Sequence, residues 1–594
     1  VALPLAPAEA RSMSPAAKER LLAAMPAVET RFRQRAAQNQ APATAFGVIY
    51  QGELIYSLGF GVREVAGGAP AGPDTIFRIA SMTKSFTAAA ILQLRDQGRL
   101  RLDDAVRDYV PEVTGWILPS ADGAPLTIRQ LLTMSAGFPQ DDPWADRQLY
   151  QVDEALSAFY RQGATFSSPP GSQFEYSNWG YMLLGRIITN VSGQPALAYI
   201  SRNLIQPLGM KDTGWSASQL PADRIALPYF WLDEAHQPEE LLPSNGDNAA
   251  FAGLFTTVPD LARWVAFFLD AWPARDDEDS AILLRSSRRE MQQVGRPTPP
   301  SLAPAPLGDR PVAVSGGYGF GLTQRHNGRY TVVGHGGGLP GYGSYMCWSP
   351  DHQLGIVAMA NNRYAGLGQI SMGVLHWLIE ETQPPAYQVT ASVALIEAMV
   401  QVNQLVEGWD DQLADEIFAD NFFLDLDRAH WQTQLQELRQ KHGKLTPAGP
   451  IEPENWLRGS WRLDGERGHC SFWLSLTPLV PPRIQQLKIN SVGPLSAAMT
   501  AAAQQLEALV NQPNKRGLDQ LRARGSNRAA LWRRLQLAHL LAGPGQMGAP
   551  VSGDGEQTVT LHWHGTGSDV RVTLHLNEKG RLSEFVFAQK PALA

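Results

Sequence analysis

The sequence contains very little cysteine: its 594 residues include two, Cys347 and Cys470. We expect these two residues to lie in different domains, so they do not form the disulfide framework of a small secreted scaffold. No apolar run reaches the ~18–20 residues that a membrane-spanning helix needs. A strong excess of charge is also absent, because the net charge is −7. These features exclude a disulfide scaffold and a membrane span, and they give no reason to expect nucleic acid as a partner.

The length of the chain corresponds to several domains, at roughly 100–200 residues per domain. The hydrophobic content of 44% is ordinary for a globular protein and is sufficient for a large core. Residues 1–10 contain recurring Ala-x-Ala motifs and resemble the tail of a processed signal peptide, although a trimmed start explains them equally well. We therefore expect a periplasmic or secreted protein and leave a cytoplasmic one open.

Residues up to 382 change from strand patterns to helix patterns and back to strands. The hydrophobic spacing predicts helices over 14–36, 81–95, 126–135, 179–191, 259–272 and 366–382. Alternating apolar residues predict strands over 45–50, 54–58, 318–325, 329–333, 343–348 and 354–360. The Asn327-Gly328 pair is a strong hairpin signal between the third and fourth of these strands. We therefore expect an α+β domain in which an antiparallel sheet from both ends packs against a helical middle.

The remaining residues, 386–594, repeat one pattern of two helices and three strands. In the first copy, the helices are expected near 390–407 and 431–441 and the strands near 456–464, 468–476 and 483–490. In the second copy, the helices are expected near 496–510 and 528–541 and the strands near 557–564, 569–576 and 581–588. The two copies share little sequence identity, so the predicted repeat rests on the order of the elements.

The first candidate for chemistry is Ser81-Met82-Thr83-Lys84, at the start of an expected helix. Positions i and i+3 of a helix share one face, so the Ser81 hydroxyl is expected beside the Lys84 amine. A desolvated lysine can take the proton of a serine hydroxyl and make it a nucleophile. Taken alone, the pattern also fits an ordinary helix start with a serine cap. Of the nine lysines, however, only Lys84 has a serine three residues before it.

Two further motifs extend this candidate site. Tyr176-Ser177-Asn178 offers a tyrosine as an acid or base and an amide that can hold the lysine or a substrate carbonyl. His335-Gly336-Gly337-Gly338 follows an expected strand, and its glycines allow the backbone to approach a substrate closely. Taken alone, the first motif also fits a turn with a packing tyrosine, and His335 also fits an ordinary strand residue.

Together, Ser-x-x-Lys, Tyr-x-Asn and His-x-Gly resemble, in this order, the class C β-lactamase branch of the penicillin-recognising serine hydrolases. The spacings also agree, with 95 residues from Ser81 to Tyr176 and 159 from Tyr176 to His335. Further similar stretches lie at 127–133, 170–171, 176–181, 207–210 and 334–337. The resemblance covers residues 30–382 and implies the fold of that family.

The resemblance also implies a role for each motif residue. Ser81 becomes acylated, Lys84 activates it, and Tyr176 acts as a general base and as the proton donor to the leaving group. The substrate is contacted by Asn178, His335, Gly337 and Gly338, and the oxyanion hole consists of the backbone N–H groups of Ser81 and Gly338. Water then cleaves the acyl-enzyme, and no metal or cofactor takes part. The order in which Lys84 and Tyr176 act stays open.

His335 departs from the family pattern, in which a lysine often occupies this position and holds a substrate carboxylate. Because histidine is only partly charged near neutral pH, the sequence favours substrates without that carboxylate. We expect a small-molecule ester, or a D-amino-acid amide or peptide, as the substrate. The alternatives are a β-lactamase or D-Ala-D-Ala carboxypeptidase, and a non-catalytic sensor or scaffold that keeps the fold.

The expected domains are an N-terminal segment with the start of the first helix at 1–29, a serine hydrolase domain at 30–382, and two small α+β units at 386–491 and 492–594. The two small units weakly resemble NTF2-like domains, which often serve as spacers, lids or dimer surfaces. We therefore expect that they can mediate homo-oligomerisation. A metal site at His562, His564 and His575 is a minor alternative to an exposed strand face.

Overall fold

A computed structural model of the chain describes residues 15–120, 122–241, 243–244, 246–304, 311–387, 389–565 and 569–589. These residues divide near Tyr387 into two compact units. We name them the larger unit, up to Tyr387, and the smaller unit, from residue 389 onward, and describe each by itself. None of the described helices has the length and apolarity needed to cross a bilayer.

The larger unit is built on one antiparallel sheet with the strand order β3-β2-β1-β14-β13-β12-β11-β10-β8, in which β9 pairs with β10. The strands of this sheet are β1 Ala43–Tyr50, β2 Glu53–Glu64, β3 Ala69–Pro70, β8 Arg296–Pro297, β9 Ser301–Pro304, β10 Pro311–Tyr318, β11 Thr323–His326, β12 Thr331–Leu339, β13 Tyr342–Ser349 and β14 Leu354–Ala360. Strand β1 pairs with β14 from Thr44↔Ala360 to Tyr50↔Leu354, so both ends of the unit meet in the middle of the sheet, as expected.

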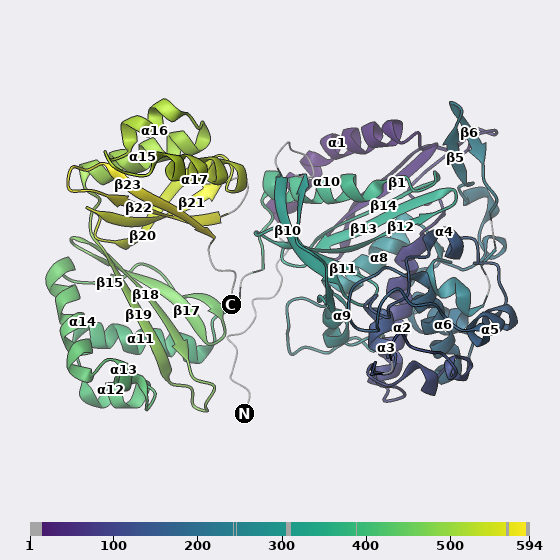
Figure 1. Cartoon of the computed structure of the whole chain (residues 1–594), viewed down its shortest axis with the longest axis horizontal. Helices are drawn as coiled ribbons and strands as arrows, with labels where there is room; N and C mark the ends of the chain where they lie inside the picture. The colour runs from purple at the N-terminus through teal and green to yellow at the C-terminus, as the bar shows by residue number, and fades with distance from the viewer. Residues whose placement is uncertain are drawn as a thin grey trace. The chain divides into compact units, whose positions relative to one another are not determined.

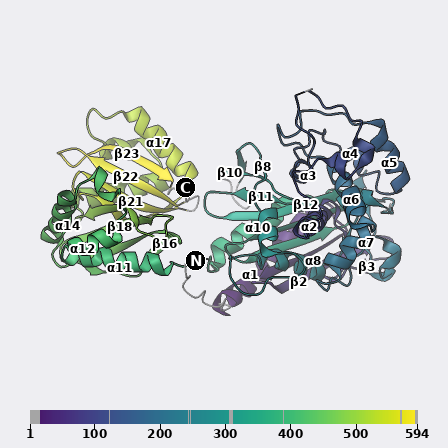
Figure 2. The same cartoon turned by 90° about the horizontal axis from the view of Figure 1, so that it is seen from below.

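Helices cover both faces of this sheet (Figures 1 and 2). One face packs against α1 Pro15–Gln38 and α10 Leu367–Thr382. The other packs against α2 Thr83–Asp96, α8 Val258–Leu269 and the helical middle of the chain. Because both faces are covered, β1 is buried at all eight positions instead of alternating.

The helical middle of the larger unit consists of short elements around α6. Its helices are α3 Ile128–Leu132, α4 Asp142–Ala145, α5 Asp153–Gln162, α6 Asn178–Ser192, α7 Ala196–Ile200 and α9 Arg285–Met291. Two small strand pairs accompany them, β4 Phe77–Arg78 with β7 Phe255–Thr256 and β5 Tyr229–Leu232 with β6 Ala235–Pro238. The short 3₁₀ segment η7 Asp247–Phe251 packs against α6 and α2.

Two expectations differ from the structure. Helix α1 buries Leu21 and Met25, which lie before the expected boundary at residue 30, so this helix contributes to the core of the larger unit. The single strand expected over 318–325 is wrong: β10 ends at Tyr318, β11 begins at Thr323, and the chain turns between them. Gly321 in this turn has φ of 67°, a left-handed conformation that glycine adopts without steric cost.

The smaller unit contains two successive groups of helices followed by strands, and each group has more elements than the two helices and three strands that the sequence predicts. The first group consists of α11 Val393–Glu407, α12 Asp411–Ile417, α13 Phe422–Asp425, α14 Arg428–His442, β15 Thr446–Pro447, β16 Glu452–Asn455, β17 Arg458–Gly465, β18 Gly468–Leu476 and β19 Ile484–Val492. The second consists of α15 Ala497–Asn511, α16 Lys515–Leu521, α17 Arg528–Leu541, β20 Gly545–Gly553, β21 Thr558–Gly565, β22 Asp569–Leu576 and β23 Leu582–Gln589.

The two groups share one sheet, in which β19 and β20 pair in parallel at Val492↔Gly553 (Figure 1). Their helices also begin alike, because an N-cap side chain accepts a backbone N–H at each corresponding start. These N-cap residues are Ser392 and Ser496, Asp410 and Asn514, and Asp427 and Asn527. The two cysteines are buried free thiols in different units, as expected.

Candidate active site

Ser81 lies in a strained turn that leads into α2. The turn is the short 3₁₀ segment Ala80–Met82, and Ala80, fully buried, has φ of 49°. A left-handed conformation costs a non-glycine residue about 1–2 kcal/mol, so the surrounding structure must hold it. One such contact is the Ser344 hydroxyl, which donates to the Ile79 carbonyl oxygen at 2.8 Å. The turn therefore holds Ser81, which is partly exposed, at the start of a buried helix.

The Lys84 side chain is fully buried, and its amine has three partners. Nζ lies 3.0 Å from Ser81 Oγ, 2.6 Å from Asn178 Oδ1 and 3.2 Å from the Phe251 carbonyl oxygen. The last two are carbonyl oxygens, which only accept hydrogen bonds. A neutral Lys84 amine has two N–H donors and one lone pair. If the donors bond to the two carbonyl oxygens, the lone pair faces the Ser81 hydroxyl.

Aromatic rings enclose the Lys84 amine. Nζ lies 5.0 Å from the centre of the Tyr176 ring, 5.1 Å from that of Phe251 and 5.6 Å from that of Tyr181. Tyr181 is itself fully buried, and its hydroxyl donates to the Leu132 carbonyl oxygen. These rings help to exclude water from the amine.

Burial lowers the pKa of Lys84 from 10.5 to about 7. Three carboxylates oppose this effect by attraction, in the order Asp142, Asp141 and Asp146. The cause is mainly desolvation, which disfavours the charged ammonium. A lysine with such a pKa is present in part as the free amine near neutral pH, as a general base requires.

Tyr176 contacts Ser81 through a side-chain hydrogen bond. Burial raises the pKa of Tyr176 well above 10, and its hydrogen bond with the Ser81 side chain only partly offsets this effect. Its ring contacts those of Tyr318 and His335, each with centres 6.2 Å apart. Tyr176 is therefore a neutral phenol at neutral pH, able to donate a proton.

Asn178 is the first residue of α6, and its position is fixed by the loop before α4. Its backbone N–H donates to Asp141 Oδ1 at 2.7 Å, and the next N–H, that of Trp179, donates to Asp141 Oδ2 at 2.9 Å. Asp141 thus caps the helix from another segment, where a negative charge also favours the helix dipole. The Asn178 Nδ2 donates to Asp142 Oδ1 at 2.9 Å, which leaves Oδ1 for Lys84.

His335 is buried in β12, and both its ring nitrogens have protein partners. Nδ1 lies 2.6 Å from the Gly336 carbonyl oxygen, an acceptor, so Nδ1 carries the hydrogen. Nε2 then accepts from the Tyr318 hydroxyl at 2.9 Å. Burial, together with the Lys84 charge, lowers the pKa of His335 from 6.5 to about 3. The expectation of a partly charged histidine is therefore wrong, because burial keeps the ring neutral.

The glycines after His335 let β12 run past the Ser81 turn. A Cβ atom on Gly337 would overlap the Ile79 carbonyl oxygen, and one on Gly338 would overlap the Tyr364 ring. Residues 335–339 continue beyond the part of β12 that pairs with β11, so this edge of the strand faces the turn. The structure therefore brings the predicted residues Ser81, Lys84, Tyr176 and Asn178 together, with His335 and the glycines beside them.

Asp146 and Tyr364 are two further residues beside the site. The Tyr364 hydroxyl donates to Asp146 Oδ2, and the Tyr364 ring packs against Gly338. Burial raises the pKa of Asp146 from 3.8 to about 7. Sequence reasoning missed both residues, together with Asp141, Asp142 and Tyr318. The sole local signal is the acidic stretch at 141–146, because the partners of these residues lie far away in the chain.

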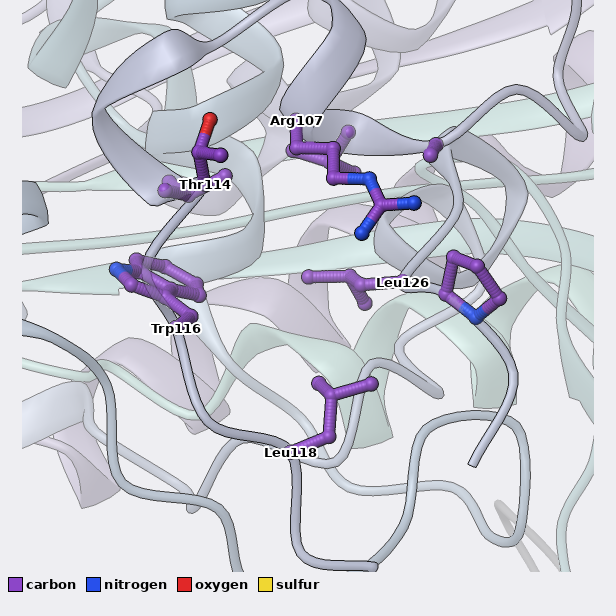
Figure 3. A pocket seen from close by; sticks show the side chains of 9 residues that line it. Arg107, Thr114, Trp116, Leu118 and Leu126 are labelled. Carbon is purple, nitrogen blue, oxygen red and sulfur yellow. The ribbon is translucent and has the colours of Figure 1, made fainter. Parts of the chain in front are cut away.

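Other candidate features do not assemble into sites. Among the described residues, no group of three or more His, Cys, Asp or Glu side chains could hold a metal ion. His575 is paired with Thr558 across β21 and β22, four positions from His562, so the three strand histidines do not converge. A cavity of about 60 Å³, lined by apolar residues together with Arg107 and Thr114, contains none of the motif residues. Its lining is drawn in Figure 3.

Two curated proteins are similar to about half of this chain. Protein flp from Staphylococcus aureus is 29% identical over 327 residues, which cover 54% of this chain and 59% of that protein. The chain therefore matches less than two thirds of the length of this relative. The D-alanyl-D-alanine-carboxypeptidase/endopeptidase AmpH from Escherichia coli is 28% identical over 289 residues, which cover 48% of this chain and 70% of that protein.

One solved structure matches nearly the whole chain. The octameric penicillin-binding protein homologue from Pyrococcus abyssi aligns with a TM-score of 0.51 and 20% identity, covering 95% of this chain and 98% of that one. At this identity, the match shows a shared fold. The family profile described as Beta-lactamase matches residues 28–373, more than half of the chain. The chain therefore belongs to the Beta-lactamase family, within the superfamily of serine β-lactamases and penicillin-binding proteins.

Proposed function

We propose that the larger unit is a serine hydrolase that forms an acyl-enzyme on Ser81 with an ester or a D-amino-acid amide or peptide. The observation that carries this proposal is the contact of 3.0 Å between Lys84 Nζ and Ser81 Oγ. The other two partners of the amine are carbonyl oxygens, so the lone pair of a neutral Lys84 faces the hydroxyl that must lose its proton.

Proton transfer follows from the lowered pKa of Lys84 and the raised pKa of Tyr176. Lys84, with a pKa of about 7, takes the proton of the Ser81 hydroxyl as Oγ bonds to the substrate carbonyl carbon. Tyr176, a neutral phenol, gives its proton to the leaving oxygen or nitrogen as the bond to the carbonyl carbon breaks. The Lys84 ammonium then reprotonates Tyr176. Water attacks the ester by the reverse sequence and restores the Ser81 hydroxyl.

The oxyanion that forms on the carbonyl oxygen needs donors fixed in advance. We assign this role to the backbone N–H groups of Ser81 and Gly338. Support comes from the close approach of β12 to the Ser81 turn, which the lack of a side chain at Gly337 permits. Asn178 and Gly337 would then border the substrate carbonyl. His335, whose ring nitrogens are both occupied, would act by fixing Tyr318.

The charges of the site favour a substrate without a carboxylate beside His335. The imidazole of His335 is neutral, so it cannot attract an anion as a lysine does. Three carboxylates, those of Asp141, Asp142 and Asp146, attract the Lys84 ammonium. This arrangement supports esters and D-amino-acid amides over carboxylate-bearing β-lactams.

The second candidate function is that of a D-Ala-D-Ala carboxypeptidase, and the similarity to AmpH favours it. A β-lactamase is the related alternative. A non-catalytic sensor is a weaker candidate, because a chain that only binds has no need to keep a base at 3.0 Å from the nucleophile. The acyl-enzyme chemistry is common to the catalytic candidates, which differ in the group that the site accepts.

The test is hydrolysis of a short-chain p-nitrophenyl ester by the wild type and by Ser81→Ala. We expect hydrolysis by the wild type and its loss in Ser81→Ala, with unchanged folding by circular dichroism. Undiminished hydrolysis by the variant would refute the assignment of Ser81 as the nucleophile. Rates with D-alanine p-nitroanilide and with a chromogenic cephalosporin would then separate the amidase from the β-lactamase.

We propose in addition that the smaller unit, read as two NTF2-like halves, joins copies of this chain into an oligomer. Helix α17 exposes Leu537, Leu540 and Leu541, which share one helix face, and such apolar surface is typical of protein interfaces. The homologue from Pyrococcus abyssi with the same fold is octameric. Light scattering should give an oligomer for the wild type and a smaller mass for Leu537→Asp/Leu540→Asp. A monomeric wild type would overturn this proposal.

A further inference from the structure

Asp142 contacts Asn178, which in turn contacts Lys84. It is the first residue of α4, and its carboxylate is partly buried. Oδ1 accepts from Asn178 Nδ2 at 2.9 Å, and Oδ2 accepts from Gln140 Nε2 at 3.0 Å. Asp142 therefore holds the far side of the Asn178 amide, the group that binds Lys84.

This contact determines which way the Asn178 amide faces. A carboxylate can only accept, so the NH₂ group of the amide must point to Asp142 and the carbonyl oxygen to Lys84. In the reverse orientation, the NH₂ group would meet the donors of Lys84, and two carbonyl-type oxygens would face each other. Asn178 has no exposed surface, so water cannot compensate for such a reversal.

Charged and titratable groups surround Lys84 on every side. Ser81 belongs to the turn before α2, Tyr176 to the loop before α6, Tyr181 to α6 and His335 to β12. The loop that contains α4 contributes Asp141, Asp142 and Asp146. Asp141 is occupied with capping α6, and Asp146 with Tyr364. Among the three, Asp142 attracts the ammonium most strongly and is linked to it through one amide.

We propose that Asp142 is a positioning residue for acyl transfer, which holds the Asn178 carbonyl oxygen toward Lys84 and supplies the negative charge that keeps this lysine basic. The inference rests on the proposed function, because it assigns Lys84 as the base. Asp142 does not touch the nucleophile and acts through Asn178. Its loss should therefore alter how the base titrates, which a purely structural role would leave unchanged.

The test is the pH dependence of kcat/KM for p-nitrophenyl ester hydrolysis by the full chain. In Asp142→Asn, we expect the acid limb of the profile to move roughly 0.5–1 pH unit lower. The lost carboxylate no longer stabilises the Lys84 ammonium, so the pKa of Lys84 falls. The plateau should fall roughly tenfold, since the base is weaker and Asn178 is less restrained. Asp142→Glu keeps the charge and should return the acid limb to its wild-type position. Asp223→Asn, an exposed aspartate on the same unit, is the matched control and should match the wild type.

A double-mutant cycle tests the route through Asn178. Asp142→Asn combined with Asn178→Ala should cost less than the product of the two single losses, because the part of the Asp142 effect that acts through the Asn178 amide is already lost in Asn178→Ala. An acid limb of Asp142→Asn at the wild-type position, or a combined loss equal to the product of the single losses, would overturn the assignment. Ser81→Ala, assayed in parallel, separates this failure from that of the proposed function, which fails if this variant hydrolyses the ester like the wild type. Thermal unfolding identifies any variant that is misfolded; if Asp142→Asn is misfolded, Asp142→Ser, which also removes the charge, replaces it in the same comparison with Asp142→Glu.

Discussion

Burial controls the protonation of the residues around Ser81. Lys84, Asp146 and His335 are each nearly or fully buried, and in each case desolvation moves the pKa toward the neutral form. Lys84 and Asp146 reach values of about 7, and His335 about 3. The chemistry of the site near neutral pH thus depends on excluding water, more than on direct ion pairing.

His335 should stay neutral throughout the pH range in which the enzyme is assayed. We expect its ring to carry the proton on Nδ1 from pH 5 to pH 8, seen by NMR of the ¹⁵N-labelled imidazole with His335→Gln for assignment. A His335 ring that titrates near pH 6.5 would contradict the structure. Since its pKa is lower in the folded state than in the unfolded state, His335 contributes stability above pH 6.5 that is lost as the pH falls toward 3. In His335→Gln, this part of the acid sensitivity should disappear.

Asp146 should make the larger unit less stable as the pH rises. Its folded pKa of about 7 lies above the usual 3.8, so the folded state binds this proton more tightly than the unfolded state does. Its contribution to stability is therefore present below pH 3.8 and is lost between pH 3.8 and 7. In Asp146→Asn, the stability relative to the wild type, measured as the free energy of unfolding in urea, should be about 1–3 kcal/mol higher at pH 8 than at pH 5. Equal differences at the two pH values would show that Asp146 ionises normally.

The site residues that the sequence predicts either have their partners close by in the chain or belong to a recognisable motif. Ser81 and Lys84 are three positions apart on one helix, and their contact follows from helix geometry. Asp142 and Tyr318 could not be predicted in this way. Asp142 meets Asn178 across 36 residues, and Tyr318 meets His335 across 17. Such contacts depend on tertiary packing, which no local pattern encodes.

At the scale of elements, the turn before α2 and the edge of β12 form the site by close backbone approach. Gly337 has no space for a side chain, because a Cβ atom would overlap the Ile79 carbonyl oxygen and the Ser344 hydroxyl. We expect Gly337→Ala to push β12 away from Ser81 and to reduce kcat for ester hydrolysis at least ~10²-fold, the usual effect of losing an oxyanion donor. Gly115→Ala, where the added methyl group meets no atom within 4 Å, is the control. Unchanged kcat in Gly337→Ala would mean that this approach does not position the oxyanion hole.

Elements with clear periodicity could be predicted, and irregular ones could not. The expected helix over 366–382 and strand over 354–360 match α10 and β14 closely, since both have regular apolar spacing. Strand β20 was missed because its sequence, Gly-Gln-Met-Gly-Ala-Pro-Val-Ser-Gly, contains glycine and proline and lacks alternation. Its pairing with β19 and β21 supplies the order that its own residues do not specify.

At the scale of the whole molecule, the chain combines a serine hydrolase fold with a smaller unit that the sequence describes less well. The order of the predicted helices and strands of the smaller unit follows from periodicity. Strand β20, which the sequence does not predict, joins the strands of the two groups into one sheet. The NTF2-like resemblance and the division at 386 and 492 stay predictions. The sequence treats the two copies as separate domains, whereas the shared sheet suggests that they unfold together.

Unfolding of the full chain should therefore show two transitions, one for each unit. Leu474 in β18 and Leu574 in β22 are both fully buried, one in each half of the smaller unit. A buried Leu→Ala change costs about 2–5 kcal/mol, so Leu474→Ala and Leu574→Ala should lower the same calorimetric transition. The other transition, that of the larger unit, should keep its temperature in both variants. Leu424→Ala, in the same unit at a position 81% exposed, is the control. If the two variants lowered different transitions, the halves would be independent domains, and the continuous sheet would not couple them.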